Sequence, residues 1–412
     1  MYAVTMQVNA EGGLRRRLNL TLLILYGLGT ILGAGIYVLI GKVAGYAGML
    51  TPLAFIIAAV LAGLTAFSYA ELASRYPRSA GVALYVYEGF RNHTLARIIG
   101  LLIVAVGVTS TAALMNGLLG YLGEFIEVQR HLTIVLLVAL LALIVIWGIK
   151  ESVLIAGAMT VLEVFGLLMI VWVARDSWST LPVKFPEMIA VGDVSAASGV
   201  LLGAFVAFYA YIGFEDMVNV AEEVKQPQKN LPRGVIVALV LTTTFYVIVA
   251  VSSVLSVAPS ILAGSDAPLA LIYQQKTGMS PLLISAISII SILNGAIIQM
   301  IMASRLLYGM SRYKWLPGFL ANVHPRTATP INASLVVAGI VLVLALSLPL
   351  LSLAKLTSFF TLIIFSLVNL ALWRIKTRNS TKAPINIPTI VPILGFAFCL
   401  AFVLYQVYAA LN

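Results

Sequence analysis

The feature that most constrains this chain is a series of long apolar runs. A helix needs about 20 consecutive, mostly apolar residues to cross the hydrocarbon core of a bilayer. Of the 412 residues, 61% are hydrophobic and only 10% are charged. The runs lie at residues 20–45, 49–73, 96–123, 131–149, 152–174, 199–221, 233–257, 281–308, 331–350, 353–373 and 388–411. We therefore predict an all-α integral membrane protein with about eleven transmembrane helices.

The composition argues against several other classes of protein. A soluble domain carries roughly 25% charged residues, far more than this chain. The net charge of +10 is not gathered on a polar domain, so the sequence does not indicate a partner nucleic acid. A single cysteine and three scattered histidines give no metal-ligand spacing. No phosphate loop or zinc-protease motif is present, and we expect neither an enzyme nor a cofactor.

The distribution of basic residues predicts the orientation. Lys and Arg concentrate in cytoplasmic loops. With the N-terminus in the cytoplasm, most of the 25 basic residues fall on the inner side of the eleven spans. We therefore predict a multi-pass protein of the plasma membrane. Its parts are a cytoplasmic tail at 1–19, a ten-helix core at 20–373, and a cytoplasmic loop with an eleventh helix at 374–412.

Two of the predicted spans contain features that interrupt a helix. The first span has four glycines between residues 27 and 35, and each costs about 1 kcal/mol relative to alanine. Close packing of helices is the alternative explanation for such glycines. The sixth span has Gly213 followed by Glu215 and Asp216. Charge at that depth usually marks a pathway or a partner, although both acids could instead pair with Lys225 or Arg233 at the helix end.

The positions of these two spans are informative. They stand first in two five-helix halves, 20–175 and 199–373. Discontinuous helices at matching places in two halves indicate the binding site of a transporter. Unwound backbone offers N–H groups, which suit a carboxylate, and carbonyl groups, which suit an ammonium ion. An α-amino acid carries both groups.

Four motifs then resemble those of the amino acid–polyamine–organocation (APC) superfamily. They are GAGIY at 33–37, YAELASRYPRSAGVALYVY at 69–87, IGFE at 212–215 with the EEVKQPQKNLPR loop at 222–233, and ASRLLYGMSR at 303–312 with the LP and HP pairs after it. The resemblance covers residues 25 to 330. It implies a leucine-transporter-like fold, a five-plus-five inverted repeat with broken helices 1 and 6, and alternating access for an amino acid substrate. Family members usually have twelve spans, one more than expected here.

The resemblance also implies a substrate site. The backbone N–H groups of Ala34 and Gly35, beside Gly33, would bind the carboxylate. The carbonyl groups of Ile31, Tyr209 and Ile212, next to Gly213, would take the ammonium group. The third helix would contribute Thr109 or Thr111, and the eighth helix Asn294. Because most of these side chains are apolar or aromatic, we expect a neutral amino acid.

A departure from the family concerns residue 163. Some relatives carry a lysine about thirteen residues after the first residue of a KES sequence like that at 150–152, and this lysine is thought to replace a sodium ion. Here the residue is Glu163, about a dozen residues into its span. A buried carboxyl group without a nearby cation is protonated at neutral pH. We expect Glu163 or Glu215 to carry a coupling proton. A sodium site and a static hydrogen bond to Ser304 or Arg305 are the alternatives.

Other functions remain open from the sequence. The leading prediction is a secondary transporter, either a proton symporter or an exchanger, with an amino acid and membrane lipid as its partners. A polyamine or organic-cation carrier would need acids in its pocket, for which Glu163 and Glu215 are the deep candidates. A receptor or scaffold that does not transport is the third possibility. The residue pattern gives no oligomeric state.

Overall fold

The computed structural model describes residues 18–32, 35–77, 81–147, 153–312, 314–324, 327, 329–378 and 383–411. Most of the predicted tail, residues 1–17, lies outside this part of the chain. The first half contains α1 (Leu20–Leu32), α2 (Gly35–Ala47), η1 (Gly48–Leu50), α3 (Thr51–Arg75), α4 (Gly81–Phe90), α5 (His93–Leu122), α6 (Arg130–Trp147) and α7 (Val153–Val173).

The second half follows a short connection, which consists of η2 (Arg175–Thr180) and α8 (Leu181–Ile189). The elements after it are α9 (Val194–Phe208), η3 (Tyr209–Tyr211), η4 (Phe214–Glu223), α10 (Pro227–Ser256), α11 (Pro259–Gly264), α12 (Pro268–Thr277), α13 (Leu282–Arg312), η5 (Gly318–Ala321), α14 (Ile331–Ser347), α15 (Leu350–Arg378) and α16 (Ile390–Leu411).

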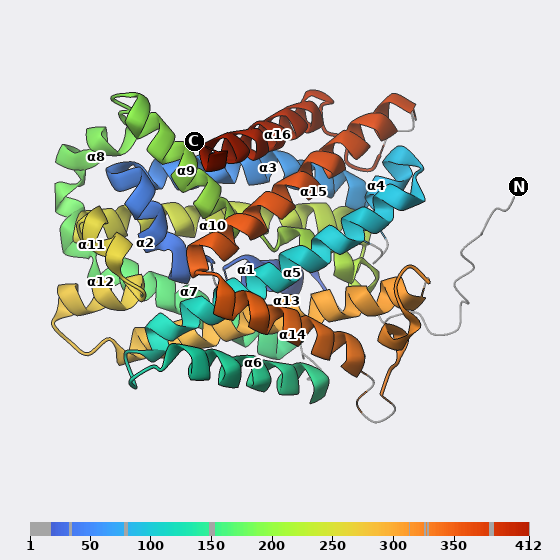
Figure 1. Ribbon diagram of the computed structural model, residues 1–412. Helices are drawn as coiled ribbons and strands as arrows, with labels where there is room; N and C mark the ends of the chain where they lie inside the picture. Colours follow the sequence, from blue (N-terminus) through green and yellow to red (C-terminus); the bar gives the residue numbers. More distant parts are fainter. Residues whose placement is uncertain are drawn as a thin grey trace, which may run out of the picture.

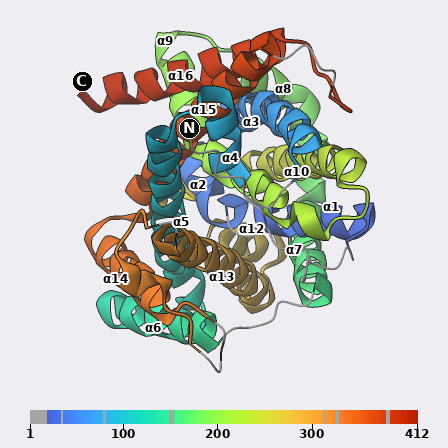
Figure 2. The ribbon, with the colours of Figure 1, turned by 90° about the vertical axis from the view of Figure 1, so that its right-hand side faces the viewer.

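The long helices run side by side (Figure 1), with α8, α11 and α12 at one end of the molecule and α4 at the other. In one group α1 and α3 pack against α10, and α2 and α3 pack against α9. In a second group α5 packs against α13, and α6 packs against α14 (Figure 2). The groups are built from equivalent helices of the two halves, as a repeated architecture requires.

Small residues allow α5 and α13 to approach closely. A Cβ atom added at Gly107 would lie 2.9 Å from the Cβ of Ala303, and one at Gly100 would lie 3.0 Å from the sulfur of Met310. Membrane helices lack a hydrophobic drive toward one another, so they associate through such close packing. The crossing of α5 and α13 therefore fixes the second group as a rigid wall beside the first.

The described part of the chain does not test the expected eleven spans completely. In the described part of the chain, eight helices are long and apolar enough to cross a membrane, or nine if the bent pair Gly157–Val173 and Arg175–Ile189 is one span. The helices Leu20–Leu32 and Ile331–Ser347 are shorter. At 1.5 Å per residue, 13 residues reach about 20 Å, which is less than the roughly 30 Å of a bilayer core. Eleven stays a prediction.

A buried ion cluster attaches α16 to the rest of the protein. The Glu71 carboxylate of α3 is fully buried and accepts hydrogen bonds from Arg75 at 2.6 Å and from Lys376 of α15 at 2.8 Å. It also accepts the backbone N–H of Ile387 at 2.9 Å. Lys376 in turn donates to the carbonyl oxygen of Ile387 and the side chain of Asn386. Two cations and one carboxylate thus tie the loop before α16 to α3 and α15.

Candidate functional site

The two predicted helix breaks cross in direct contact. Gly213 separates η3 from η4 and has φ +129°, a value that other residues rarely adopt. A Cβ atom added there would collide with the carbonyl oxygen of Thr30, near the end of α1. A Cβ atom added at Gly35, where α2 begins, would collide with the Cα of Ala210. Glycine at these two positions lets the backbones of the two broken helices touch.

Tyr246 of α10 joins the two breaks. Its hydroxyl group lies 2.8 Å from the carbonyl oxygen of Ile31 and 2.8 Å from that of Ala210. The side chain is fully buried, and its ring packs edge-on against Phe55 and Tyr211. Carbonyl groups left free by a broken helix must find partners in a membrane. Tyr246 shares its one hydroxyl hydrogen between a carbonyl group from each break and holds the breaks together.

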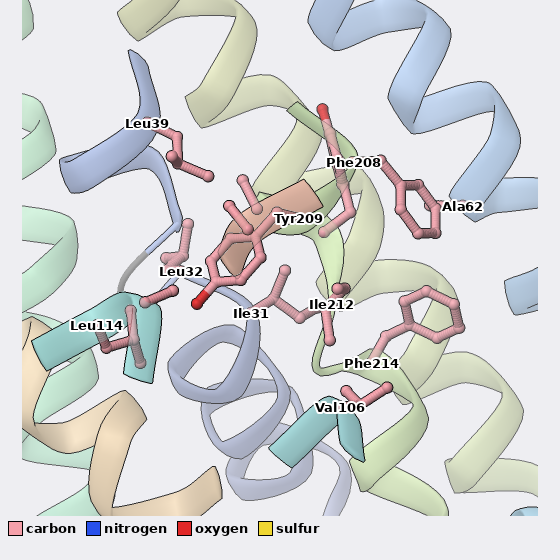
Figure 3. Packing of buried hydrophobic residues seen from close by; sticks show 14 of the residues in the cluster. Ile31, Leu32, Leu39, Ala62, Val106, Leu114, Phe208, Tyr209, Ile212 and Phe214 are labelled. Atoms are coloured by element: carbon pink, nitrogen blue, oxygen red, sulfur yellow. The ribbon is translucent and has the colours of Figure 1, made fainter. Parts of the chain in front are cut away.

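A small cavity of about 30 Å³ lies at the crossing. This volume holds only one or two water molecules. Figure 3 shows Ile31 and Ile212 close together, with the ring of Tyr209 beside Leu32 and its hydroxyl group directed toward the helix that carries Leu114. The residues around the cavity come from both broken helices and from the wall formed by α5 and α13: Thr30, Ile31, Gly35, Ser110, Leu114, Tyr209, Ile212, Gly295, Ile298 and Gln299.

Four of the residues expected in the substrate site line this cavity, namely Ile31, Gly35, Tyr209 and Ile212. Gly213 forms the break itself. Gly33 and Ala34 lie outside the described residues.

The remaining predicted side chains point elsewhere. The Thr109 hydroxyl donates to the carbonyl oxygen of Ala105 and accepts from Thr357 at 2.8 Å. Thr111 donates to the carbonyl oxygen of Gly107, and Asn294 contacts Glu163. None of these three lines the small cavity.

Two polar residues of the cavity did not stand out in the sequence. Ser110 stands between Thr109 and Thr111 in the sequence. Its hydroxyl group is 2.9 Å from the hydroxyl group of Tyr209. Gln299 of α13 is 7% exposed, and its Oε1 atom has no hydrogen-bond partner among the described residues. Ser110 therefore positions the Tyr209 ring across the cavity, and Gln299 supplies a free acceptor at its wall.

Glu163 of α7 lies close to the first break. Its side chain is fully buried, and Oε1 accepts a hydrogen bond from Asn294 of α13 at 3.2 Å. Its Oε2 atom has no partner in the part of the chain that the structure describes. The hydroxyl of Tyr37, two residues into α2, donates to the backbone carbonyl of Glu163 at 2.6 Å. The carboxyl group thus sits where α7, α13 and the start of α2 meet, without the bond to Ser304 considered above.

A second cavity, of about 410 Å³, lies next to the small one and shares Ile298 with it. Its lining includes Glu215, Asp216, Tyr69 and Val82, which belongs to α4. This cavity therefore extends from the crossing toward the α4 end (Figure 1). We call it the acidic cavity.

The opposite end of the crossing is covered. The α11 helix packs on α2, and a Cβ atom at Gly41 would collide with the carbonyl oxygen of Leu262. Lys42 of α2 donates to the carbonyl oxygens of Ala263 at 3.1 Å and Ser265 at 3.4 Å. Access to the crossing is thus asymmetric: the α4 end has a cavity, whereas α11 closes the other end.

The α1–α2 segment and the η3–η4 segment cross, with the acidic cavity on one side of the crossing and the α11 helix on the other. This arrangement is that of a membrane transporter of the leucine-transporter-like fold. A solved structure supports this fold: that of MhsT in complex with L-phenylalanine matches with a TM-score of 0.67 at 14% identity, over 96% of this chain and 99% of that one. The predicted fold class is confirmed.

Sequence comparison identifies the family. The family model described as "Amino acid permease" matches residues 18–411. The branched-chain amino acid permease BcaP of Bacillus subtilis (strain 168) is 30% identical over 96% of this chain and 89% of its own length. A methylthioribose transporter of the same organism is 31% identical over 94% and 88%. The cationic amino acid transporter 4, vacuolar, of Arabidopsis thaliana is 29% identical over 86% and 62%.

The chain therefore belongs to the amino acid permease family of the APC superfamily, as its motifs indicated. It is a multi-pass membrane transporter, and it is not an enzyme.

Proposed function

We propose that this protein carries a neutral amino acid across the plasma membrane by alternating access, with its N-terminus in the cytoplasm. The observation that carries the proposal is the crossing of the two breaks. There the α2 helix begins at Gly35, so its partial positive charge suits a carboxylate. Ile31 and Ile212 line the same cavity, and we expect their carbonyl groups to take the ammonium group, that of Ile31 through the lone pair that Tyr246 leaves free.

The lining of the small cavity supports a neutral substrate. Ile31, Leu114, Ile212 and Ile298 surround it, and it contains no charged side chain. An apolar substrate side chain would replace water there at little cost. Relatives differ in what their names say they carry, from branched-chain amino acids to cationic amino acids. The apolar lining favours the first of these for this chain.

The substrate requires more room than the crossing provides. A typical ligand site encloses about 300–1,000 Å³, whereas the small cavity encloses about 30 Å³. We therefore assign this conformation to the carrier with its substrate site collapsed and its α4 end accessible, which is the cytoplasmic end in the proposed orientation.

We assign proton coupling to Glu163, with Glu215 as the second candidate. Glu163 contacts α13 through Asn294, and Tyr37 of α2 contacts its backbone. A carboxyl group at the junction of the two helix groups is sensitive to their relative movement. The Oε2 atom of Glu163 has no hydrogen-bond partner among the described residues, so it can accept a proton. A hard cation such as sodium would also bind a carboxylate, so both ions enter the test.

The test is uptake of labelled amino acids and putrescine by proteoliposomes that contain the full chain. Each substrate is measured with an inward proton gradient, with an inward sodium gradient, and with neither. We expect proton-stimulated uptake of a branched-chain amino acid. Glu163→Gln should abolish the stimulation but preserve exchange against preloaded substrate. Glu187→Gln, which alters an exposed carboxyl group, is the matched control.

Four results would contradict parts of this proposal. Sodium stimulation in place of proton stimulation would refute the coupling ion. Unchanged proton stimulation in both Glu163→Gln and Glu215→Gln would remove these residues from coupling. Binding of amino acids without any flux would indicate a receptor, and movement of putrescine alone would indicate a polyamine carrier.

A further inference from the structure

The acidic cavity has a composition that transport of a neutral amino acid does not by itself explain. Three carboxyl groups line it, those of Glu215, Asp216 and Glu223, against one cation, Arg305. The Arg305 side chain is exposed. None of the three carboxyl groups forms an ion pair within the described residues. Lys225 and Arg233, which the sequence offered as partners for Asp216, form none either.

The local bonds of η4 leave part of this charge unsatisfied. Oε2 of Glu215 accepts the backbone N–H of Gly213 at 2.9 Å, so this carboxyl group is held at the break. Oδ1 of Asp216 lies 3.5 Å from Nδ2 of Asn219. The Oδ2 atom of Asp216 has no partner among the described residues, although the side chain is only 5% exposed.

A second, independent group on the same cavity also lacks a partner. Tyr69 of α3 is fully buried, and its hydroxyl group makes no hydrogen bond to a described residue. Its ring packs edge-on against Phe214 and Phe365 at 5.7 Å. Tyr69 lines the same cavity as Glu215 and Asp216. A buried polar atom without a partner is rare and costs about 1–3 kcal/mol.

The remaining walls define what kind of cation fits. Much of the lining is aliphatic or aromatic, including Val106, Ile298, Ile301, Ile364 and Phe365. A bare metal ion needs several oxygen ligands around it at once, whereas most of these walls are aliphatic or aromatic. A primary ammonium group on an apolar body instead matches both parts: its three donors suit a carboxylate and a hydroxyl oxygen, and aromatic faces attract a cation.

We propose that the acidic cavity is a second binding site, selective for a primary ammonium group on an apolar body, with Asp216 and Tyr69 as its ligands. It differs from the site at the helix crossing because it recognises the ammonium group without the carboxylate. The inference rests on the proposed function in one respect. An amino acid that leaves the crossing toward the α4 end would bring its α-ammonium group to this site. A free amine or diamine is the other source of the same group.

The test separates these groups chemically. The probes are 3-methylbutan-1-amine, which is leucine without its carboxylate, 4-methylpentanoate, which lacks the ammonium group, and putrescine. Equilibrium binding of the labelled amine is measured on the purified full chain in detergent, in buffers of equal ionic strength containing choline or sodium. The variants are Asp216→Asn and Tyr69→Phe. The control is Asp176→Asn, which changes a carboxyl group on a side chain that is 84% exposed. Uptake of leucine is measured separately.

We expect the wild-type chain to bind the amine and putrescine but not 4-methylpentanoate at this site. Because a hydrogen bond between charged groups contributes about 1.5–3 kcal/mol, Asp216→Asn should weaken amine binding by about tenfold or more. Tyr69→Phe, which removes one hydroxyl group and keeps the ring, should weaken it severalfold. Asp176→Asn should bind the amine as the wild type does.

Several outcomes would overturn the proposal. Leucine uptake without any amine binding refutes the second site and leaves the proposed function intact. Equal amine binding by wild type, Asp216→Asn and Tyr69→Phe refutes the assigned ligands. Displacement of the amine by sodium but not by choline indicates an inorganic cation site instead. Amine binding that responds to the variants, in a chain that moves no amino acid, supports the site and refutes the proposed function.

Discussion

Replacing Gly213 with alanine tests whether the contact between the two breaks is what makes this chain a transporter. Alanine there meets two obstacles. The backbone at φ +129° is a conformation that costs a residue with a side chain about 1–3 kcal/mol. The new methyl group also collides with the carbonyl oxygen of Thr30, and overpacking of this kind costs about 1–3 kcal/mol. The two effects together come to about 2–6 kcal/mol.

We expect the strain introduced by Gly213→Ala to slow the transport cycle more than it destabilises the fold. The states of a transporter differ by only a few kcal/mol, and about 2 kcal/mol corresponds to roughly a 30-fold change in rate. We therefore expect Gly213→Ala to lower the initial rate of amino acid uptake by proteoliposomes at least about 30-fold. Size-exclusion chromatography of the purified variant, run beside the uptake assay, should show folded protein in normal yield.

Three further glycines separate the two causes. Gly35→Ala adds the collision with Ala210 without a positive φ, and we expect it to reduce uptake as well. Gly278→Ala has φ +67° in open space, so it should lower stability slightly and leave uptake unchanged. Gly309→Ala lies within α13 with no neighbouring atom within 4 Å and should behave as wild type. Wild-type uptake by Gly213→Ala would refute the reasoning.

The remaining predictions concern the stability of the chain and the packing of α11 over the helix crossing. Glu71→Gln leaves Lys376 buried with a weakened partner, so it should destabilise the chain by about 3–5 kcal/mol, measured as a lower melting temperature in detergent. Tyr246→Phe removes the hydroxyl group shared by two carbonyl groups and should cost about 1–3 kcal/mol; an unchanged melting temperature would contradict its bridging role. Lys42→Met removes the bonds to Ala263 and Ser265, so amide exchange in residues 259–264 should accelerate, whereas protection equal to wild type would show that α11 needs no such cover.

The helix breaks could be predicted from the sequence because their cause is local. Clustered glycines weaken a helix wherever they occur, and Gly213 stands next to two acids in an apolar span. The structure places the break at this glycine, with a positive φ that the residue type allows. The approximate position of the acidic pair followed from the same reasoning, since charge within a span is costly unless it has a use.

The faces of the unbroken helices could not be predicted in the same way. Thr109, Ser110 and Thr111 are consecutive hydroxyl residues, each rotated by about 100° from the last. In a helix that is apolar all round, no hydrophobic stripe indicates which of the three faces the crossing. The structure selects Ser110, which bonds Tyr209. Gln299 and Tyr69 likewise depend on the rotation of α13 and α3, which long-range packing sets.

The narrowness of the crossing has a consequence for the electrical behaviour of the membrane that holds the protein. Ions and protons leak through a protein when water forms a continuous file from one face to the other. Here the small cavity at the crossing holds one or two water molecules, and α11 covers the end beyond it. A membrane that contains many copies of this protein therefore keeps its resting conductance, so the ion gradients that power other transporters are preserved.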